Sequence, residues 1–264
     1  MDLGIRGKTA LVGGASQGIG YAIAHLLAEE GATVAMVARK PEPLAEACAR
    51  ITADTGARTV AIAADIRKRE DCERIVQEAL AALPGIDLLI NNDGAPPLGK
   101  LDTFDDLAWQ RAVEQNLMSV VRLCRGFLPG MRSRGFGRIV NMTALSVLQP
   151  IPEFGLSVAS WAGVLGYAKT LSLEAAADGV TVNTICPGRF ATGRVAKVYG
   201  VPAKGGRPDP EALAKMAREL QIPVGRIGDP REIAGLVGFL CSSFAGYMTG
   251  HALHVDGGRR ASLA

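Results

Sequence analysis

The sequence predicts one α/β domain in which a parallel sheet is covered by helices on both faces. Short β-branched or apolar segments alternate with helical patterns from one end of the chain to the other. Strict β–α alternation is typical of parallel strands joined by crossover helices. The length of 264 residues is sufficient for one large core. Because we find no linker and no internal repeat, we assign residues 1–264 to a single domain.

The strands are expected where apolar segments are short. These segments are residues 9–12, 33–37, 59–64, 86–91, 138–142, 180–185 and 252–256. The first helix follows a Gly-rich turn and ends at Gly31, with Ile19, Ile23 and Leu27 on one face. Further helices are expected from Pro41 or Pro43, from about Arg69, over 104–131, over 157–177 and from Asp229-Pro230.

The segment of about 189–225 interrupts this alternation. It is rich in Gly, Pro and Lys. We expect one short helix in it, with Asp209 as N-cap and Pro210 as the first helical residue.

Composition excludes several classes of protein. Hydrophobic residues make up 48% of the chain and charged residues 21%, which is not the composition of a disordered chain. No uncharged apolar run is long enough for a membrane span, and a net charge of +3 does not favour a nucleic-acid partner. The charged N-terminus has no signal-peptide pattern, so a cytoplasmic location is expected.

Cysteine and histidine positions do not indicate a metal site. The five cysteines are scattered and form no CxxC pair. His251 and His254 lie on an expected strand, where their side chains should point to opposite faces.

A phosphate-binding turn is indicated between the first strand and the first helix. Gly14, Gly18 and Gly20 have the spacing GxxxGxG within residues 13–20. Glycines at such positions let the backbone turn tightly and approach a pyrophosphate, while the helix N-terminus offers free N–H groups. The position between a strand and a helix makes the motif specific.

Further motifs along nearly the whole chain resemble those of the short-chain dehydrogenase/reductase family. They are Asp65-Ile66, Asn91-Asn-Asp-Gly94 (with Asp93 where the family has Ala), Asn116, Pro187-Gly188 followed by Thr192, and the C-terminal segments 222–230 and 247–258. The resemblance implies a Rossmann-type doubly wound sheet of seven parallel strands in the order 3-2-1-4-5-6-7. It also implies a nicotinamide cofactor, and it makes segment 189–225 the expected mobile substrate lid. The cofactor-binding residues expected from the resemblance and the Gly-rich turn are Gly14, Ser16, Gln17, Gly18, Ile19, Gly20, Arg39, Asp65, Ile66, Asn92, Gly94, Trp161, Pro187, Gly188 and Thr192.

The end of the second strand favours NADP(H) over NAD(H). An acidic residue there would accept a hydrogen bond from the ribose 2′-OH of NAD. This chain has Ala38 at that place, followed by Arg39, whose guanidinium can pair with a 2′-phosphate. The alternative is that Arg39 is an exposed loop residue and the protein does not discriminate.

The catalytic residues of the family are replaced at the positions to which the resemblance assigns them. The family uses Ser, Tyr and Lys with a supporting Asn. Here Ala144, Ser157 and Trp161 stand at the first three positions, and only Asn116 is retained. None of the four tyrosines is followed four residues later by Lys. Ser157 is a poor acid or base at neutral pH, and Ser146 is a candidate to take the place of Ala144.

The proton donor must then come from elsewhere. Tyr199, Glu153 and Asp93 are the candidates. We expect an NADP(H)-dependent oxidoreductase with a non-standard active site, acting on a small carbonyl or alcohol compound. The alternatives are a nucleotide-binding sensor or partner subunit without activity, and a repurposed non-redox enzyme such as a lyase or isomerase. The resemblance implies a homodimer or homotetramer through helices 104–131 and 157–177.

Overall fold

The computed structural model describes residues 2–94, 96–204 and 207–262, so residues 205–206 of the predicted lid lie outside it. One sheet has the strand order β3-β2-β1-β4-β5-β6-β9, with every neighbouring pair parallel. This confirms the expected order of seven strands. The strands are β1 (Thr9–Gly13), β2 (Thr33–Ala38), β3 (Thr59–Ala63), β4 (Leu88–Asn91), β5 (Gly137–Met142), β6 (Val180–Pro187) and β9 (Ala252–Val255).

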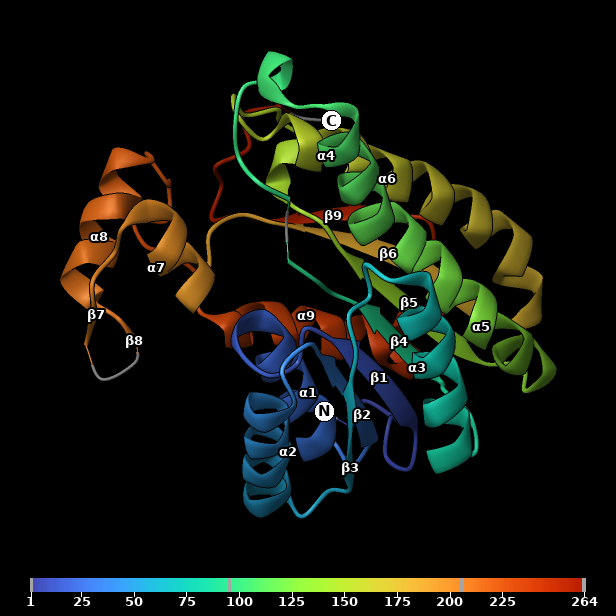
Figure 1. Cartoon of the computed structure of the whole chain (residues 1–264). Coiled ribbons are helices and arrows are strands. Elements are labelled where there is room, and N and C mark those ends of the chain that lie inside the picture. The colour runs from blue at the N-terminus through green and yellow to red at the C-terminus, as the bar shows by residue number, and fades with distance from the viewer. Residues whose placement is uncertain (1, 95, 205–206, 263–264) are drawn as a thin grey trace.

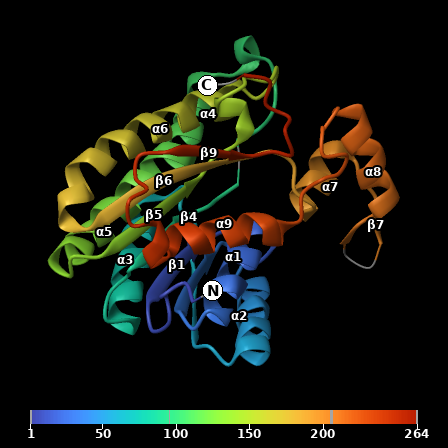
Figure 2. The same cartoon turned by 180° about the vertical axis from the view of Figure 1, so that it is seen from behind.

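Helices cover both faces of this sheet, as Figures 1 and 2 show. Helices α1 (Gly18–Glu29), α2 (Pro41–Thr55) and α9 (Pro230–Cys241) pack on one face, and α3 (Arg69–Ala82), α5 (Ser119–Ser133) and α6 (Gly155–Ala175) on the other. A hydrophobic core lies on each face of the sheet, and alternate residues of a strand point into one or the other. Ala10 and Val12 belong to the core under α1, α2 and α9, and Leu11 belongs to the core under α3, α5 and α6. Short 3-10 turns lie at Leu101–Thr103, Leu145–Val147, Ala176–Asp178 and Ser243–Ala245.

The helix expected over 104–131 has an unexpected internal feature. Asp105 caps its start by accepting a hydrogen bond from the Ala108 N–H at 2.8 Å, so α4 (Asp106–Val113) begins two residues late. A π-helical turn (Glu114–Met118) then joins α4 to α5. The turn contains Asn116. A π-turn inserts one residue into a helix and is common at functional sites.

The segment predicted as a lid contains more structure than expected. It holds two helices, α7 (Gly193–Tyr199) and α8 (Pro210–Glu219), so the expectation of one helix is wrong. The second begins at Pro210 after Asp209, as predicted. The strands β7 (Ala203–Lys204) and β8 (Arg207–Pro208) pair antiparallel between the helices. Figure 1 shows the segment projecting from one side of the sheet. Its residues form a small core together with Ile227, which follows the segment: Val195, Met216, Ala217, Ile222 and Ile227.

Three further findings bear on the excluded classes. Within the described part of the chain, no helix is long and apolar enough to cross a bilayer. The same residues contain no cluster of His, Cys, Asp and Glu arranged to hold a metal ion. All five cysteines are free and buried.

Candidate active site

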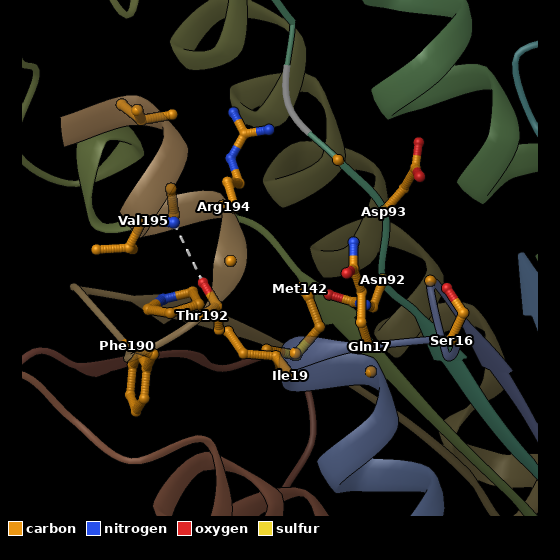
Figure 3. A pocket seen from close by; sticks show the side chains of 18 of the residues that line it. Ser16, Gln17, Ile19, Asn92, Asp93, Met142, Phe190, Thr192, Arg194 and Val195 are labelled. Carbon is orange, nitrogen blue, oxygen red and sulfur yellow. Dashed lines mark hydrogen bonds between the residues drawn. The ribbon is translucent and has the colours of Figure 1, made fainter. Parts of the chain in front are cut away.

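A cavity of about 670 Å³ lies at the carboxyl ends of the strands. Its walls come from the turn after β1, the ends of β2, β5 and β6, the loops after β3 and β4, and helix α7. The strand order reverses between β1 and β4, and ligands of open α/β sheets bind at such a reversal. All predicted cofactor-binding residues except Asp65 line this cavity. Figure 3 shows part of its wall.

The Gly-rich turn forms the floor of the cavity. Gly14 and Gly18 have φ values of +60° and +61°, which favour glycine. A Cβ atom on Gly20 would lie 2.3 Å from the carbonyl oxygen of Gly14, so the turn can close only without that atom. The Asn92 amide donates a hydrogen bond of 2.9 Å to the Gly13 carbonyl and holds the turn against β4. No side chain caps the first turn of α1, so its N–H groups are free to bind an anion.

Cationic side chains stand beside the end of β2. Arg39 and Lys40 are exposed and line the cavity. Arg39 forms no hydrogen bond or ion pair with any residue that the structure describes. This placement agrees with the use that the sequence predicts for Arg39.

The two acidic residues near this end differ in their surroundings. Asp65 lies outside the cavity wall, and Arg67 donates hydrogen bonds of 2.8 and 3.1 Å to its carboxylate. The same hydrogen bonds hold the pKa of Asp65 below its usual value. Asp93 lines the cavity, and desolvation by the cavity walls raises its pKa to about 6, although its side chain is accessible from the cavity.

One wall at the other end of the cavity is apolar, and we call this end the apolar end. Ala144 and the indole of Trp161, which is 8% exposed, form the wall at the end of β5 and along α6. Ser157 does not line the cavity: it is 0% exposed, and its hydroxyl has no hydrogen-bond partner. The Ser146 hydroxyl is likewise buried, without a partner and outside the wall. A group at this end of the cavity therefore meets neither of these two hydroxyls.

Of the candidate proton donors, Tyr199 lines the cavity and Glu153 does not. Tyr199 lies at the end of α7 and lines the cavity, with 36% of its surface exposed. Glu153 is exposed and outside the cavity wall, and its backbone has a φ of +69°. Its carbonyl accepts a hydrogen bond of 2.9 Å from the Gly99 N–H, so its role in the structure is that of a turn residue.

Asn116 lies behind Trp161. Its amide nitrogen donates a hydrogen bond of 2.8 Å to the Ser160 hydroxyl, which donates to the Leu156 carbonyl at 2.7 Å. The Asn116 Oδ1 atom is buried without a partner. Asn116 and Trp161 both border a small second cavity of about 20 Å³. The π-turn thus places the Asn116 amide on the interior side of Trp161 and not on the main cavity wall.

Comparison with known proteins identifies the family. A family model described as enoyl-(acyl carrier protein) reductase matches residues 14–260. The chain is 38% identical over 258 residues to a 3-oxoacyl-(acyl-carrier-protein) reductase of Vibrio cholerae, covering 97% of this chain and 98% of that protein. The chain belongs to the short-chain dehydrogenase/reductase family. The resemblance drawn from the motifs is therefore confirmed, and the protein is a member of a family of oxidoreductases.

Two solved structures of short-chain dehydrogenases/reductases are informative about the site. The L-sorbose reductase of Gluconobacter frateurii, in complex with NADPH and L-sorbose, has a TM-score of 0.93, 35% identity and coverage of 100% of both chains. An NADPH-bound short-chain oxidoreductase of Pseudomonas aeruginosa has a TM-score of 0.89, 32% identity and coverage of 97% of both chains. The latter is described as containing an atypical catalytic centre.

Reasoning from the sequence missed three polar residues of this short-chain dehydrogenase/reductase site. Arg189 and Arg194 line the cavity, and Ser160 accepts the hydrogen bond of Asn116. Arg189 follows directly on Pro187-Gly188, so its place beside a recognised motif was an available signal. Arg194 lies two residues after Thr192, which caps α7 by accepting from the Val195 N–H at 3.4 Å (Figure 3). Ser160 carries no signal beyond its place one residue before Trp161.

Proposed function

We propose that this protein is an NADP(H)-dependent oxidoreductase that acts on a small carbonyl or alcohol compound with a non-standard active site. The observation that carries the proposal is that one end of the cavity offers groups that bind anions and the other has an apolar wall. One end has the uncapped N-terminus of α1 and the unpaired guanidinium of Arg39, and the other presents Ala144 and Trp161. The NADPH-bound relatives support the choice of cofactor.

The residues present fit a dinucleotide phosphate. The N–H groups at the start of α1 would hold the pyrophosphate, and Arg39 would pair with the 2′-phosphate. Thr192, Pro187 and Gly188 line the cavity as Trp161 does, and they would hold the nicotinamide end. NADPH supplies a hydride when bound, and the chain supplies orientation and the proton. Asp65 would act only indirectly, since Arg67 occupies its carboxylate.

The chain must deliver a proton without a Tyr-x-x-x-Lys pair. In this proposal Ala144, Ser157 and Trp161 occupy the places of the family's Ser, Tyr and Lys. Ser157 is sealed from the cavity, so its hydroxyl does not reach a substrate there. Trp161 offers an N–H group and an apolar face but no charge.

Tyr199 is the proton donor that the geometry favours. Its ring lies at the apolar end, where Arg189 stands over it at 5.1 Å from the ring centroid. Asp93 interacts electrostatically with Arg39, Asp65 and Arg67 on one side and with Arg194 on the other, which places it between the two ends of the cavity. Glu153 does not reach the cavity. Asn116 then acts as a positioning residue, because it contacts α6 through Ser160 directly beside Trp161.

The surroundings of the site suggest how it closes and assembles. We place the substrate lid at 189–225, because α7 lies over the cavity and the segment packs through a core of its own.

We also propose a homo-oligomer through α4–α5 and α6. These helices leave Leu107, Val113 and Leu173 exposed, the last to 71%. Light scattering on the purified protein measures the subunit number.

The experiment that tests the function measures NADPH binding and its oxidation at 340 nm with a panel of ketones, aldehydes and oxo acids. Tyr199→Phe is expected to lower the turnover number by about 100-fold with little change in NADPH affinity, which is the size of a general acid's contribution. Tyr247→Phe is the matched control, because that tyrosine is fully exposed, at 102%, and outside the cavity.

The outcomes separate the candidate functions. Turnover that survives in Tyr199→Phe but is lost in Asp93→Asn would transfer the donor role to Asp93. Tight NADPH binding with no oxidation by any compound would refute the oxidoreductase and favour a nucleotide-binding sensor or partner subunit. Conversion of a compound without NADPH consumption would favour a lyase or isomerase.

A further inference from the structure

Three arginines gather at the apolar end of the cavity. Arg189 and Arg194 line its wall, and Arg259 is near enough to Arg189 for the two charges to repel. Burial lowers the pKa of Arg189, and the charges of Arg259 and Arg194 lower it further, although Tyr199 opposes this shift. Like charges do not gather in a partly buried place without cost unless an anion joins them.

Arg189 lies against aromatic side chains, and one of its donor groups has nothing to donate to. Its guanidinium lies between two aromatic rings, 5.4 Å from the centroid of Phe154 and 5.1 Å from that of Tyr199. Its Nε atom is buried and has no hydrogen-bond partner. No carboxylate among the described residues forms an ion pair with it. Aromatic faces fix the plane of a guanidinium and leave its N–H groups free in that plane.

The other two arginines differ in how their charge is balanced. Arg194 lies on the same wall, but Asp93 attracts it from the facing wall, as Figure 3 illustrates. A Cβ atom on Gly94 would lie 3.9 Å from an Nη atom of Arg194, so this arginine reaches toward the loop after β4. Arg259 resembles Arg189, since its Nη1 atom is buried without a partner. The uncompensated charge is therefore concentrated at Arg189 and Arg259.

We propose that the cavity binds a substrate that carries an oxyanion, and that Arg189, supported by Arg259, holds this group. The inference rests on the proposed function for its reaction but not for its binding site. The substrate is then an oxo or hydroxy compound with a carboxylate or a phosphate ester, anchored through a planar pair of N–H groups. The apolar wall of Ala144 and Trp161 leaves the remainder of the compound free of competing polar contacts.

The test compares an acid with its ester. The probes are 4-oxopentanoate, methyl 4-oxopentanoate and inorganic phosphate, each titrated calorimetrically into protein saturated with NADP⁺. The acid is expected to bind about 10-fold or more tightly than the ester, the usual effect of a charge-assisted hydrogen bond. In Arg189→Gln the preference is expected to disappear while the affinity for NADPH changes by less than about twofold.

A matched control and a second variant keep the result interpretable. Arg218→Gln removes the same charge from the same segment, but Arg218 is exposed on α8 and outside the cavity, so the acid preference should persist. Arg189→Lys keeps the charge without the planar fork and should retain part of the preference. Arg189→Gln should also raise the Tm of the ligand-free protein, because it removes a charge that nothing balances.

Each outcome decides the proposal. Arg189-dependent binding of phosphate but not of the acid supports the oxyanion site and assigns it to phosphate esters. Equal binding of acid and ester, with no Arg189-dependent phosphate binding, overturns it. So does a loss of NADPH affinity in Arg189→Gln, which would make Arg189 a cofactor contact. If NADPH is never oxidised but the acid preference depends on Arg189, the oxyanion site stands and the proposed reaction fails.

Discussion

Replacing Arg39 by Ala should separate the two nicotinamide cofactors. Arg39 is exposed at the end of β2, lines the cavity and has no partner among the described residues. Among the described residues the variant therefore removes no hydrogen bond or ion pair of the free protein, and only the longer-range attraction of Arg39 to Asp65 and Asp93 is lost. Any loss in binding comes from the contact with the 2′-phosphate, which NADH lacks.

The size of the loss follows from the exposure of Arg39. A hydrogen bond to a charged group contributes about 1.5–3 kcal/mol. Because Arg39 is exposed and Lys40 remains beside it, we take the lower part of this range, about 1.5–2 kcal/mol. This corresponds to a rise of about 10–30-fold in the Kd for NADPH. The Kd for NADH should change by less than about twofold.

The assay is a fluorescence titration of each cofactor at low and high salt. The difference between wild type and Arg39→Ala should shrink at about 0.5 M salt, because exposed charges are screened within a few ångströms there. An NADPH affinity that is unchanged, or one that falls in parallel with the NADH affinity, would refute the assignment of Arg39 to the 2′-phosphate. Restored affinity in Arg39→Lys would show that charge is sufficient.

Three further predictions concern the fold and its ionisation. Gly20→Ala should lower the free energy of unfolding in urea by about 1–3 kcal/mol and abolish NADPH binding, because its Cβ would lie 2.3 Å from a carbonyl oxygen. Gly235→Ala is the control: a Cβ there meets no atom within 4 Å, so the variant should raise the free energy of unfolding by about 0.5–1 kcal/mol. Because the pKa of Asp93 is raised in the folded protein, stability is lost as the pH rises from 3.8 through about 6. Asp93→Asn should therefore have a higher Tm than wild type at pH 8 but not at pH 3.5. An equal gain in Tm at both pH values would contradict this. Because all five cysteines are buried, an aromatic disulfide reagent should react with them only after unfolding, and rapid labelling of the native protein would contradict the fold.

The sheet was the part of the fold that the sequence predicted best. Parallel strands are buried on both faces, so each appears as a short apolar segment, and the strand bounds differ from expectation by no more than about two residues. Asp229-Pro230 likewise marked the start of α9, where the structure adds a capping box between Asp229 and Glu232. Local composition carries such features because each is decided by residues that are close in sequence.

The parts that were missed depend on contacts between distant residues. The π-turn at Asn116 adds one residue to a helix whose apolar pattern continues on both sides, so periodicity does not reveal it. Helix α7 is seven residues long and lies in a segment that its Gly and Pro content marked as irregular. Asp65 was recognised by its motif, but its engagement by Arg67 was not. Arg189 stood beside a known motif, yet its lack of a partner is a property of the folded chain alone.

Trp161 connects the two proposals for this site. A lysine at this place would bring a cation to the wall of the cavity, whereas the indole brings bulk and no charge. The cations at this end come from the opposite wall, through Arg189 on the loop after β6 and Arg194 on α7. If Tyr199 donates the proton, its charged neighbour is Arg189, which also lies over its ring. One arginine would then both anchor an anionic substrate and face the proton donor, so Arg189→Gln should lower the turnover of uncharged ketones as well as remove the preference for acids.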